Sequence, residues 1–172
     1  MSETAKYRHL TTQYTQGNGL DIGSQGDPVV PWAIQVELPA PAYAHYTSGK
    51  VLDQAGVWRG DGRVLPFKDE VCSFVYSSHL LEDFLDWTPA LREWWRVLAP
   101  SGHLVVLTPE DSLWNAAVAG GQTPNCEHRH CGRVGELTTH LLAIDPRAIV
   151  LEDRLTNCHL GDYTILFVAR KP

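Results

Sequence analysis

The stretch 19–28 constrains the fold most, because a short apolar segment there runs directly into a turn of small residues. A strand is expected over Gly19–Ile22, and Gly23 and Gly26 come after it within four positions. Glycine adopts positive φ without a Cβ penalty and lets the backbone approach a ligand closely. In an open parallel sheet, the turn after the first strand is where nucleotide-like ligands bind. Ordinary strand-to-loop turns also contain paired glycines, so the interpretation depends on the pattern of the remaining chain.

Length and composition limit the function classes. The 172 residues suffice for one domain with a sizeable core, and we expect 1–172 to form a single domain. The net charge of −6 argues against a broad phosphate-binding surface, so a nucleic-acid partner is not expected. No apolar run is long enough to span a membrane. The four irregularly spaced cysteines and the polar first residues, which lack a signal-peptide pattern, favour a cytoplasmic protein.

Apolar runs alternate with helical patterns along the chain, which predicts an α/β fold. The expected strands are 19–22, the second half of 29–38, 57–59, 72–77 and 103–108, with 149–155 and 163–169 as a late antiparallel pair. Only five residues separate Gly26 from Trp32. A crossover between parallel strands normally needs a dozen or more residues. The first crossover helix is therefore expected to be missing or reduced to a single turn.

The clearest helical pattern begins at Thr88, a candidate N-cap with Pro89 at the first helical position. Apolar residues at 91, 94, 95 and 98 then form one stripe. Further helices are expected within 1–18, around 113–119 and over 136–144, and 110–135 is otherwise expected to be a long polar loop. The order predicts a Rossmann-like three-layer sandwich, with a mostly parallel sheet and a C-terminal antiparallel strand.

Four segments, taken together and in order, resemble the class I S-adenosylmethionine-dependent methyltransferases of the small-molecule type. They are LDIGS at 20–24, GDGRVLPF at 60–67, SSHLLED at 77–83, and the helix-to-strand segment LREWWRVLAPSGHL at 91–104. They lie within roughly residues 17–110. The resemblance implies a compact methyltransferase domain with a shortened first helix and S-adenosyl-L-methionine as cofactor. A DNA base is not supported as substrate, because the Asn/Asp-Pro-Pro-aromatic motif of amino-methylating DNA enzymes is absent.

The resemblance also implies which residues surround the cofactor. Glu37 would hold the ribose hydroxyls and Asp61 the adenine amino group, since a charged acceptor makes strong hydrogen bonds. The other implied cofactor-binding residues are Asp21 and Gly23 under the methionine part, Ser24, Gln25 and Gly26 in the turn, Gly62 and Arg63 along the adenine ring, and Ser78 near the sulfonium. The family's first motif usually has glycines where this chain has Gln25 and Asp27.

The segment 125–131 carries the most unusual local chemistry, with two cysteines flanking two histidines. It is open to three interpretations: a zinc site, part of an acceptor pocket in loop 110–135, or plain surface. We expect the acceptor pocket without a metal, because a Cys-x4-Cys spacing is not a common zinc knuckle. In an extended segment His128 and His130 would point the same way. Both are candidate general bases, as is His79, and Trp114 and Asn125 are candidate acceptor contacts.

The expected function is methyl transfer from S-adenosylmethionine to an oxygen or nitrogen of a small or modest-sized acceptor. Such a reaction can depend mainly on proximity and orientation. The alternative is a non-catalytic methyltransferase-like module that binds the cofactor or a protein partner. A dinucleotide-dependent dehydrogenase is disfavoured because no Gly-x-Gly-x-x-Gly turn leads into a helix. The sequence leaves a homodimer open.

Overall fold

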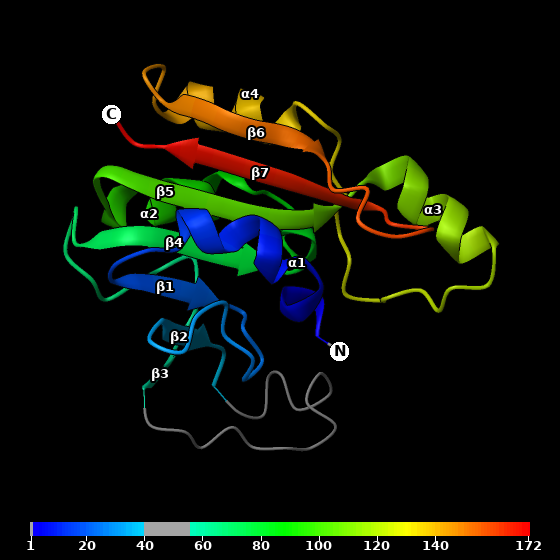
Figure 1. Ribbon diagram of the computed structural model, residues 1–172, viewed down its shortest axis with the longest axis horizontal. Helices are drawn as coiled ribbons and strands as arrows, with labels where there is room; N and C mark the ends of the chain where they lie inside the picture. Colours follow the sequence, from blue (N-terminus) through cyan, green and yellow to red (C-terminus); the bar gives the residue numbers. More distant parts are fainter. Residues whose placement is uncertain (1, 40–55) are drawn as a thin grey trace.

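The computed structural model describes residues 2–39 and 56–172, which form a seven-stranded sheet in the order β3-β2-β1-β4-β5-β7-β6 (Figure 1). The strands are β1 Gly19–Ile22, β2 Ile34–Glu37, β3 Val57–Arg59, β4 Cys72–Ser78, β5 Leu98–Pro109, β6 Ile149–Leu155 and β7 Thr164–Arg170. β1 to β5 pair in parallel, and β7 lies antiparallel between β5 and β6. This confirms the predicted α/β sheet with its antiparallel C-terminal strand.

Helices cover both faces of this sheet (Figure 1). They are α1 Glu3–Thr11, α2 Thr88–Val97, α3 Asp111–Ala119 and α4 Glu136–Ile144, with short 3-10 turns η1 Thr12–Tyr14 and η2 Leu81–Asp83. One core cluster joins α2 and α4 to the sheet through Trp94 and Leu141. The other joins α1 through Tyr7. Because side chains alternate along a strand, β5 sends Val106 to the first cluster and Val105 to the second.

No crossover helix connects β1 to β2. Residues 23–33, all of which the structure describes, contain turns and bends only, as the short spacing predicted. Val29 and Val30 of this connection pack in the same cluster as Tyr7 of α1. The N-terminal helix therefore packs with this connection, on the face that a normal crossover helix would cover.

Three boundaries differ from the sequence prediction. Trp87, not Thr88, occupies the N-cap position of α2, and Asp86 Oδ1 accepts the Thr88 backbone N–H at 2.8 Å. β5 begins at Leu98, directly after the helix, so it is longer than the expected strand. Within loop 110–135, the expected helical segment begins at Asp111 with Glu110 as its cap.

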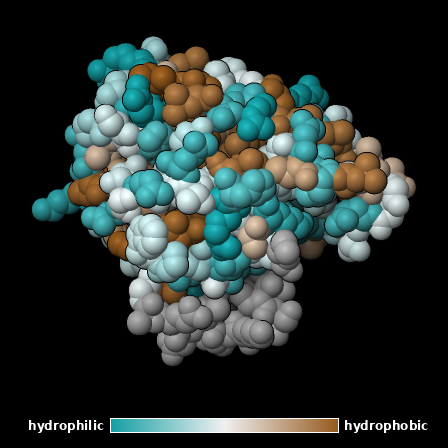
Figure 2. Space-filling view, viewed as in Figure 1, coloured by the Kyte–Doolittle hydropathy of each residue, from teal (hydrophilic) through white to brown (hydrophobic). Residues whose placement is uncertain are grey.

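The surface of the described residues is mixed in character. Figure 2 shows polar and apolar residues interspersed over one face, with apolar residues gathered on the protruding helix α3 at the right. Among residues 2–39 and 56–172, no helix is both long enough and apolar enough to cross a membrane.

Candidate functional site

A hollow lies where β1, β2 and β3 end and meet the segment after β4. Parallel strands end at one edge of a sheet, so this edge brings together residues that are distant in sequence. The lining residues are Ile22, Gly23, Gln25, Val36, Glu37, Leu38, Gly60, Asp61, Gly62, Arg63, His79, Leu80, Asp83 and Phe84. Most of the residues predicted to bind the cofactor therefore line one hollow, together with His79.

The turn after β1 is in the left-handed region at three positions. Gly23, Gln25 and Gly26 have φ values of 81°, 51° and 82°. The Gly23 N–H donates to the Val36 carbonyl at 2.9 Å, which holds the turn against β2. A Cβ on Gly23 would lie 3.0 Å from Leu80 Cδ2. The glycine therefore serves both the positive φ and the close approach of the turn to the opposite wall.

Glu37 closes the hollow at the end of β2. Its carboxylate is buried, and its Oε1 accepts from Ser24 Oγ at 2.7 Å and from the Gln25 backbone N–H at 2.6 Å. Burial raises the pKa of Glu37, and the bonds from Ser24 and Gln25 reduce that rise. Oε2 takes part in neither of these two bonds, and the positive charge of Arg59 also reduces the rise of the Glu37 pKa.

Asp61 and Arg63 form a fork-shaped pair beside the hollow. Arg63 Nε lies 2.9 Å from Asp61 Oδ1, and its Nη2 lies 2.7 Å from Oδ2. The hydrogen bond from Arg63 lowers the pKa of Asp61. The guanidinium carbon lies 5.2 Å from the centre of the Phe84 ring, within the range of a cation–π contact. The pair thus reaches from the β3 side of the hollow to the segment after β4.

Four of the predicted cofactor residues do not line this hollow: Asp21, Ser24, Gly26 and Ser78. Asp21 alternates with Leu20 and Ile22 along β1, so its side chain faces the α1 side of the sheet. Its Oδ2 accepts the Val29 N–H at 2.6 Å, and within the described part of the chain its Oδ1 has no hydrogen-bond partner. Burial raises the pKa of Asp21 well above its ordinary value.

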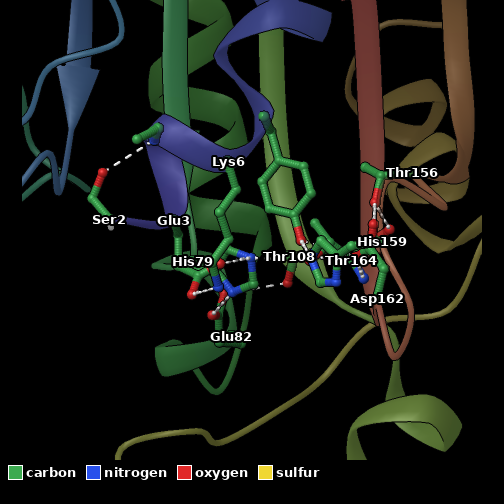
Figure 3. A network of polar contacts seen from close by, with 12 residues as sticks. Ser2, Glu3, Lys6, His79, Glu82, Thr108, Thr156, His159, Asp162 and Thr164 are labelled. Carbon is green, nitrogen blue, oxygen red and sulfur yellow. Dashed lines mark hydrogen bonds and ion pairs between the residues drawn. The ribbon is translucent and has the colours of Figure 1, made fainter.

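His79 lines the hollow and also belongs to a network of polar side chains that includes Glu3, Glu82 and Thr164 (Figure 3). It directly follows β4 and has a φ of 52°. Its Nδ1 is 3.4 Å from Glu82 Oε1, while its Nε2 is 3.2 Å from Thr164 Oγ1 and 3.7 Å from Glu3 Oε2. Burial lowers the pKa of His79, but the close contact with Glu82 and the negative charges of Glu82 and Glu3 outweigh it, so the pKa is raised.

His128 approaches the same carboxylate from loop 110–135. Its Nε2 lies 3.6 Å from Glu82 Oε1, and its ring centre lies 4.7 Å from that of Trp114. Trp114 in turn packs on Tyr163 at 5.1 Å. Burial lowers the pKa of His128 despite the nearby Glu82 charge. The structure therefore brings two candidate bases, His79 and His128, close to one carboxylate, with the candidate acceptor contact Trp114 packed on His128.

His130 and Asn125 lie elsewhere. His130 Nε2 is 2.6 Å from Glu136 Oε1, and its ring packs 4.8 Å from Trp87. Asn125 Oδ1 accepts the Glu127 N–H at 3.0 Å and so belongs to a local turn. The expectation that both histidines point into one pocket is wrong, because the segment turns at 126–127 and is not extended. In the described ranges, no three His, Cys, Asp or Glu side chains are grouped as metal ligands.

Sequence reasoning missed several residues of the site. Leu80, Asp83 and Phe84 line the hollow, and Glu82 lies behind it with no exposed surface. All four lie in or next to the SSHLLED segment, so the signal was present but pointed only to Ser78 and His79. The contribution of α1 had no local signal. Tyr7 Oη contacts Thr164 Oγ1 at 2.8 Å and donates to Asp162 Oδ1 at 2.9 Å, across more than 150 positions.

Comparisons with known proteins find similar methyltransferases. A family model described as a methyltransferase domain matches residues 32–106. Over 55 residues the chain is 42% identical to a demethylmenaquinone methyltransferase from Streptomyces griseus, a stretch that covers 32% of this chain and only 24% of that enzyme.

Solved structures match over nearly the whole chain. A methyltransferase from Thermotoga maritima, described as S-adenosylmethionine-dependent and a possible histamine N-methyltransferase, has a TM-score of 0.70 at 17% identity, covering 99% of this chain and 90% of its own. An S-adenosylmethionine-dependent methyltransferase from Archaeoglobus fulgidus has a TM-score of 0.66 at 16% identity, covering 98% and 92%. At such low identity these two matches establish the fold. The chain therefore has the fold of these S-adenosylmethionine-dependent methyltransferases, and its residues 32–106 are similar to the methyltransferase domain of the family model.

Proposed function

We propose that this chain transfers a methyl group from S-adenosylmethionine to an oxygen or nitrogen of a small or modest-sized acceptor. The observation that carries the proposal is the convergence of Glu37 and Asp61 on one hollow beside the Gly23 turn. Gly23, Glu37 and Asp61 lie at the ends of three different strands, β1, β2 and β3, and only the fold brings them together.

The lining of the hollow suits the nucleoside part of the cofactor. A ribose offers two hydroxyl donors and adenine offers an exocyclic amine, and carboxylates bind such donors strongly. We assign Glu37 to the ribose and Asp61 to the adenine amino group. Leu38, Leu80 and Phe84 supply apolar surface for the ring. Gly23 lets the turn approach Leu80 closely, and we assign this turn to the methionine part of the cofactor. When bound, the cofactor supplies an electrophilic methyl group.

The residues of the chain contribute binding and orientation. His79 lines the hollow and also contacts Glu82, the carboxylate that His128 faces from loop 110–135. We therefore place the meeting point of the two reactants at His79. Holding two reactants in line can remove several kcal/mol, roughly 7–11, from a barrier. Trp114 and His128 are proposed to face the acceptor within a single domain over 1–172, in which 110–135 is the acceptor side. A cytoplasmic location, a small-molecule acceptor and the question of a homodimer stay predictions from the sequence.

A methyltransferase-like binding module is the second candidate. It is favoured by one observation: the protein's own side chains fill the acceptor side, with Thr164 and Glu3 already beside His79 Nε2. The altered turn, with Gln25 and Asp27 in place of glycines, is consistent with that alternative.

Calorimetric titration with S-adenosylhomocysteine, followed by a turnover assay, tests the proposal. We expect stoichiometric binding, weakened by Glu37→Gln and by Asp61→Asn. We also expect product release with at least one member of a panel of hydroxyl and amine compounds. A chain that does not bind the compound contradicts the proposal. Binding without turnover on every panel member favours the module.

A further inference from the structure

The buried carboxylate of Glu82 is shared between two imidazoles. Glu82 lies in η2 with no exposed surface, and its Oε2 accepts from Thr108 Oγ1 at 3.2 Å. Its Oε1 forms no regular hydrogen bond within the described ranges. That oxygen instead faces His79 Nδ1 at 3.4 Å and His128 Nε2 at 3.6 Å. A buried carboxylate is costly unless donors face it, so these two ring nitrogens are expected to carry protons.

The remaining contacts assign the tautomers. His128 Nδ1 lies 3.7 Å from Cys131 Sγ, and burial raises the pKa of that thiol to about 12, so the thiol keeps its proton and can donate it. His128 is then neutral, with its single proton on Nε2 facing Glu82. His79 directs Nδ1 to Glu82, and its Nε2 faces a hydroxyl, that of Thr164, at 3.2 Å. A neutral His79 with its proton on Nδ1 therefore presents the Nε2 lone pair to an O–H group.

We propose that Glu82 is a positioning residue that holds the His79 proton on Nδ1, so that Nε2 can take the proton of a hydroxyl acceptor. The inference rests on the proposed function and narrows its substrate class to hydroxyl compounds. In the step, the acceptor O–H bond breaks and a bond from His79 Nε2 to the proton forms. The electron pair stays on the acceptor oxygen, which becomes the stronger nucleophile. The imidazolium is then paired with Glu82, and it returns its proton to water.

Other charged and titratable groups also face His79. Glu3 Oε2 lies 3.7 Å from Nε2, and the Lys6 charge from the same helix acts in the opposite direction. The rings of Tyr7 on α1 and of Tyr163, which precedes β7, lie 6.4 Å and 6.2 Å away. Glu82 is the carboxylate that faces Nδ1, while Glu3 faces Nε2, so only Glu82 can fix the tautomer in the direction proposed.

Imidazole NMR on the full chain tests the assignment directly. In the wild type, neutral His79 should carry its proton on Nδ1, and Glu82→Gln should lower its pKa by about one to three units, the usual effect of losing an opposite charge at this range. The matched control is Glu136→Gln, which removes a carboxylate beside His130 and should leave the His79 pKa unchanged. A His79 pKa that stays unchanged in Glu82→Gln overturns the inference, as does a wild-type proton on Nε2.

Glu82→Gln can fail to fold, so His128→Leu provides a second test. Leucine has no hydrogen-bond donor, so that variant leaves Oε1 of Glu82 to His79 alone, and the His79 pKa should rise; an unchanged or lower pKa overturns the inference. The rate of methyl transfer to hydroxyl compounds should then fall on the acidic side of its pH profile, with a midpoint at the His79 pKa. This midpoint should move to lower pH in Glu82→Gln. If transfer occurs but the midpoint does not move, the inference is overturned and the proposed function stays intact. If the wild-type chain does not bind S-adenosylhomocysteine, the proposed function itself is overturned.

Discussion

Ser24 Oγ donates a hydrogen bond to Glu37 Oε1 at 2.7 Å, which joins the turn after β1 to the end of β2. The backbone N–H of Gln25 reaches the same oxygen at 2.6 Å. Two neighbouring residues of the turn are therefore anchored on one buried carboxylate. Because Glu37 also lines the hollow, the path of the turn and the acidic wall of the site depend on the same side chain.

Glu37→Gln separates these two roles. Glutamine keeps an acceptor for Ser24 and Gln25 but removes the charge, so the fold should persist. Loss of a charged hydrogen bond to the ribose should weaken S-adenosylhomocysteine binding by about 1.5–3 kcal/mol, or roughly one to two decades in calorimetry. Glu152→Gln on the edge strand β6 is the control and should bind as the wild type does. Equal affinity in both variants would show that the ribose assignment is wrong.

Gly23→Ala tests whether the turn must approach the opposite wall. Both Gly23 and Gly161 have positive φ, at 81° and 77°, so alanine at either site should cost about 1–2 kcal/mol of unfolding free energy. Only at Gly23 would the new Cβ meet Leu80, whereas nothing lies within 4 Å at Gly161. We expect Gly161→Ala to bind S-adenosylhomocysteine normally and Gly23→Ala to bind it much more weakly. Similar affinities would mean that the hollow does not need this glycine.

Local patterns predicted the sheet and the edge where the hollow lies. Apolar runs defined the strands, and the short spacing between Gly26 and Trp32 predicted that the first crossover helix is missing or reduced to a single turn. The orientation of side chains depended on contacts that local patterns do not contain. His130 turns away because Glu136 and Trp87 contact it, and no local pattern places Trp87 near that loop.

The same limit applies to two further parts of the site. Asp21 was assigned to the cofactor from its motif; strand alternation directs its side chain to the α1 face of the sheet, and its role toward the cofactor stays a prediction. A helix was expected within 1–18, but its contact with the site depends on Tyr7, whose partners lie near the C-terminal end of the described chain. Residues this far apart in sequence are brought together only by the complete sheet.

Asp21→Asn should change how stability depends on pH. Burial raises the pKa of Asp21 in the folded chain above its unfolded value of about 3.9. The favourable contribution of protonated Asp21 to the unfolding free energy is therefore fully present at pH values below that unfolded pKa. It is lost as pH rises through the folded pKa. Asparagine does not titrate, so the variant should gain unfolding free energy relative to the wild type as pH rises above about 4. Urea unfolding across pH 4–8 measures this difference, and a difference that does not vary with pH would contradict it.

His128→Ala and His130→Ala should behave differently, although the two residues are separated by one position. His128 is largely buried against Trp114 and faces the Glu82 carboxylate, so its loss leaves a buried acceptor with one donor fewer. We expect His128→Ala to lower the unfolding free energy by about 1–3 kcal/mol and to reduce methyl transfer. His130 is half-exposed, and its pair with Glu136 contributes about 0–1 kcal/mol. His130→Ala should therefore keep near-wild-type transfer and lose little stability in urea unfolding. Equal losses of transfer in the two variants would show that the loop acts as a unit, and that the direction of the His128 side chain does not decide its role.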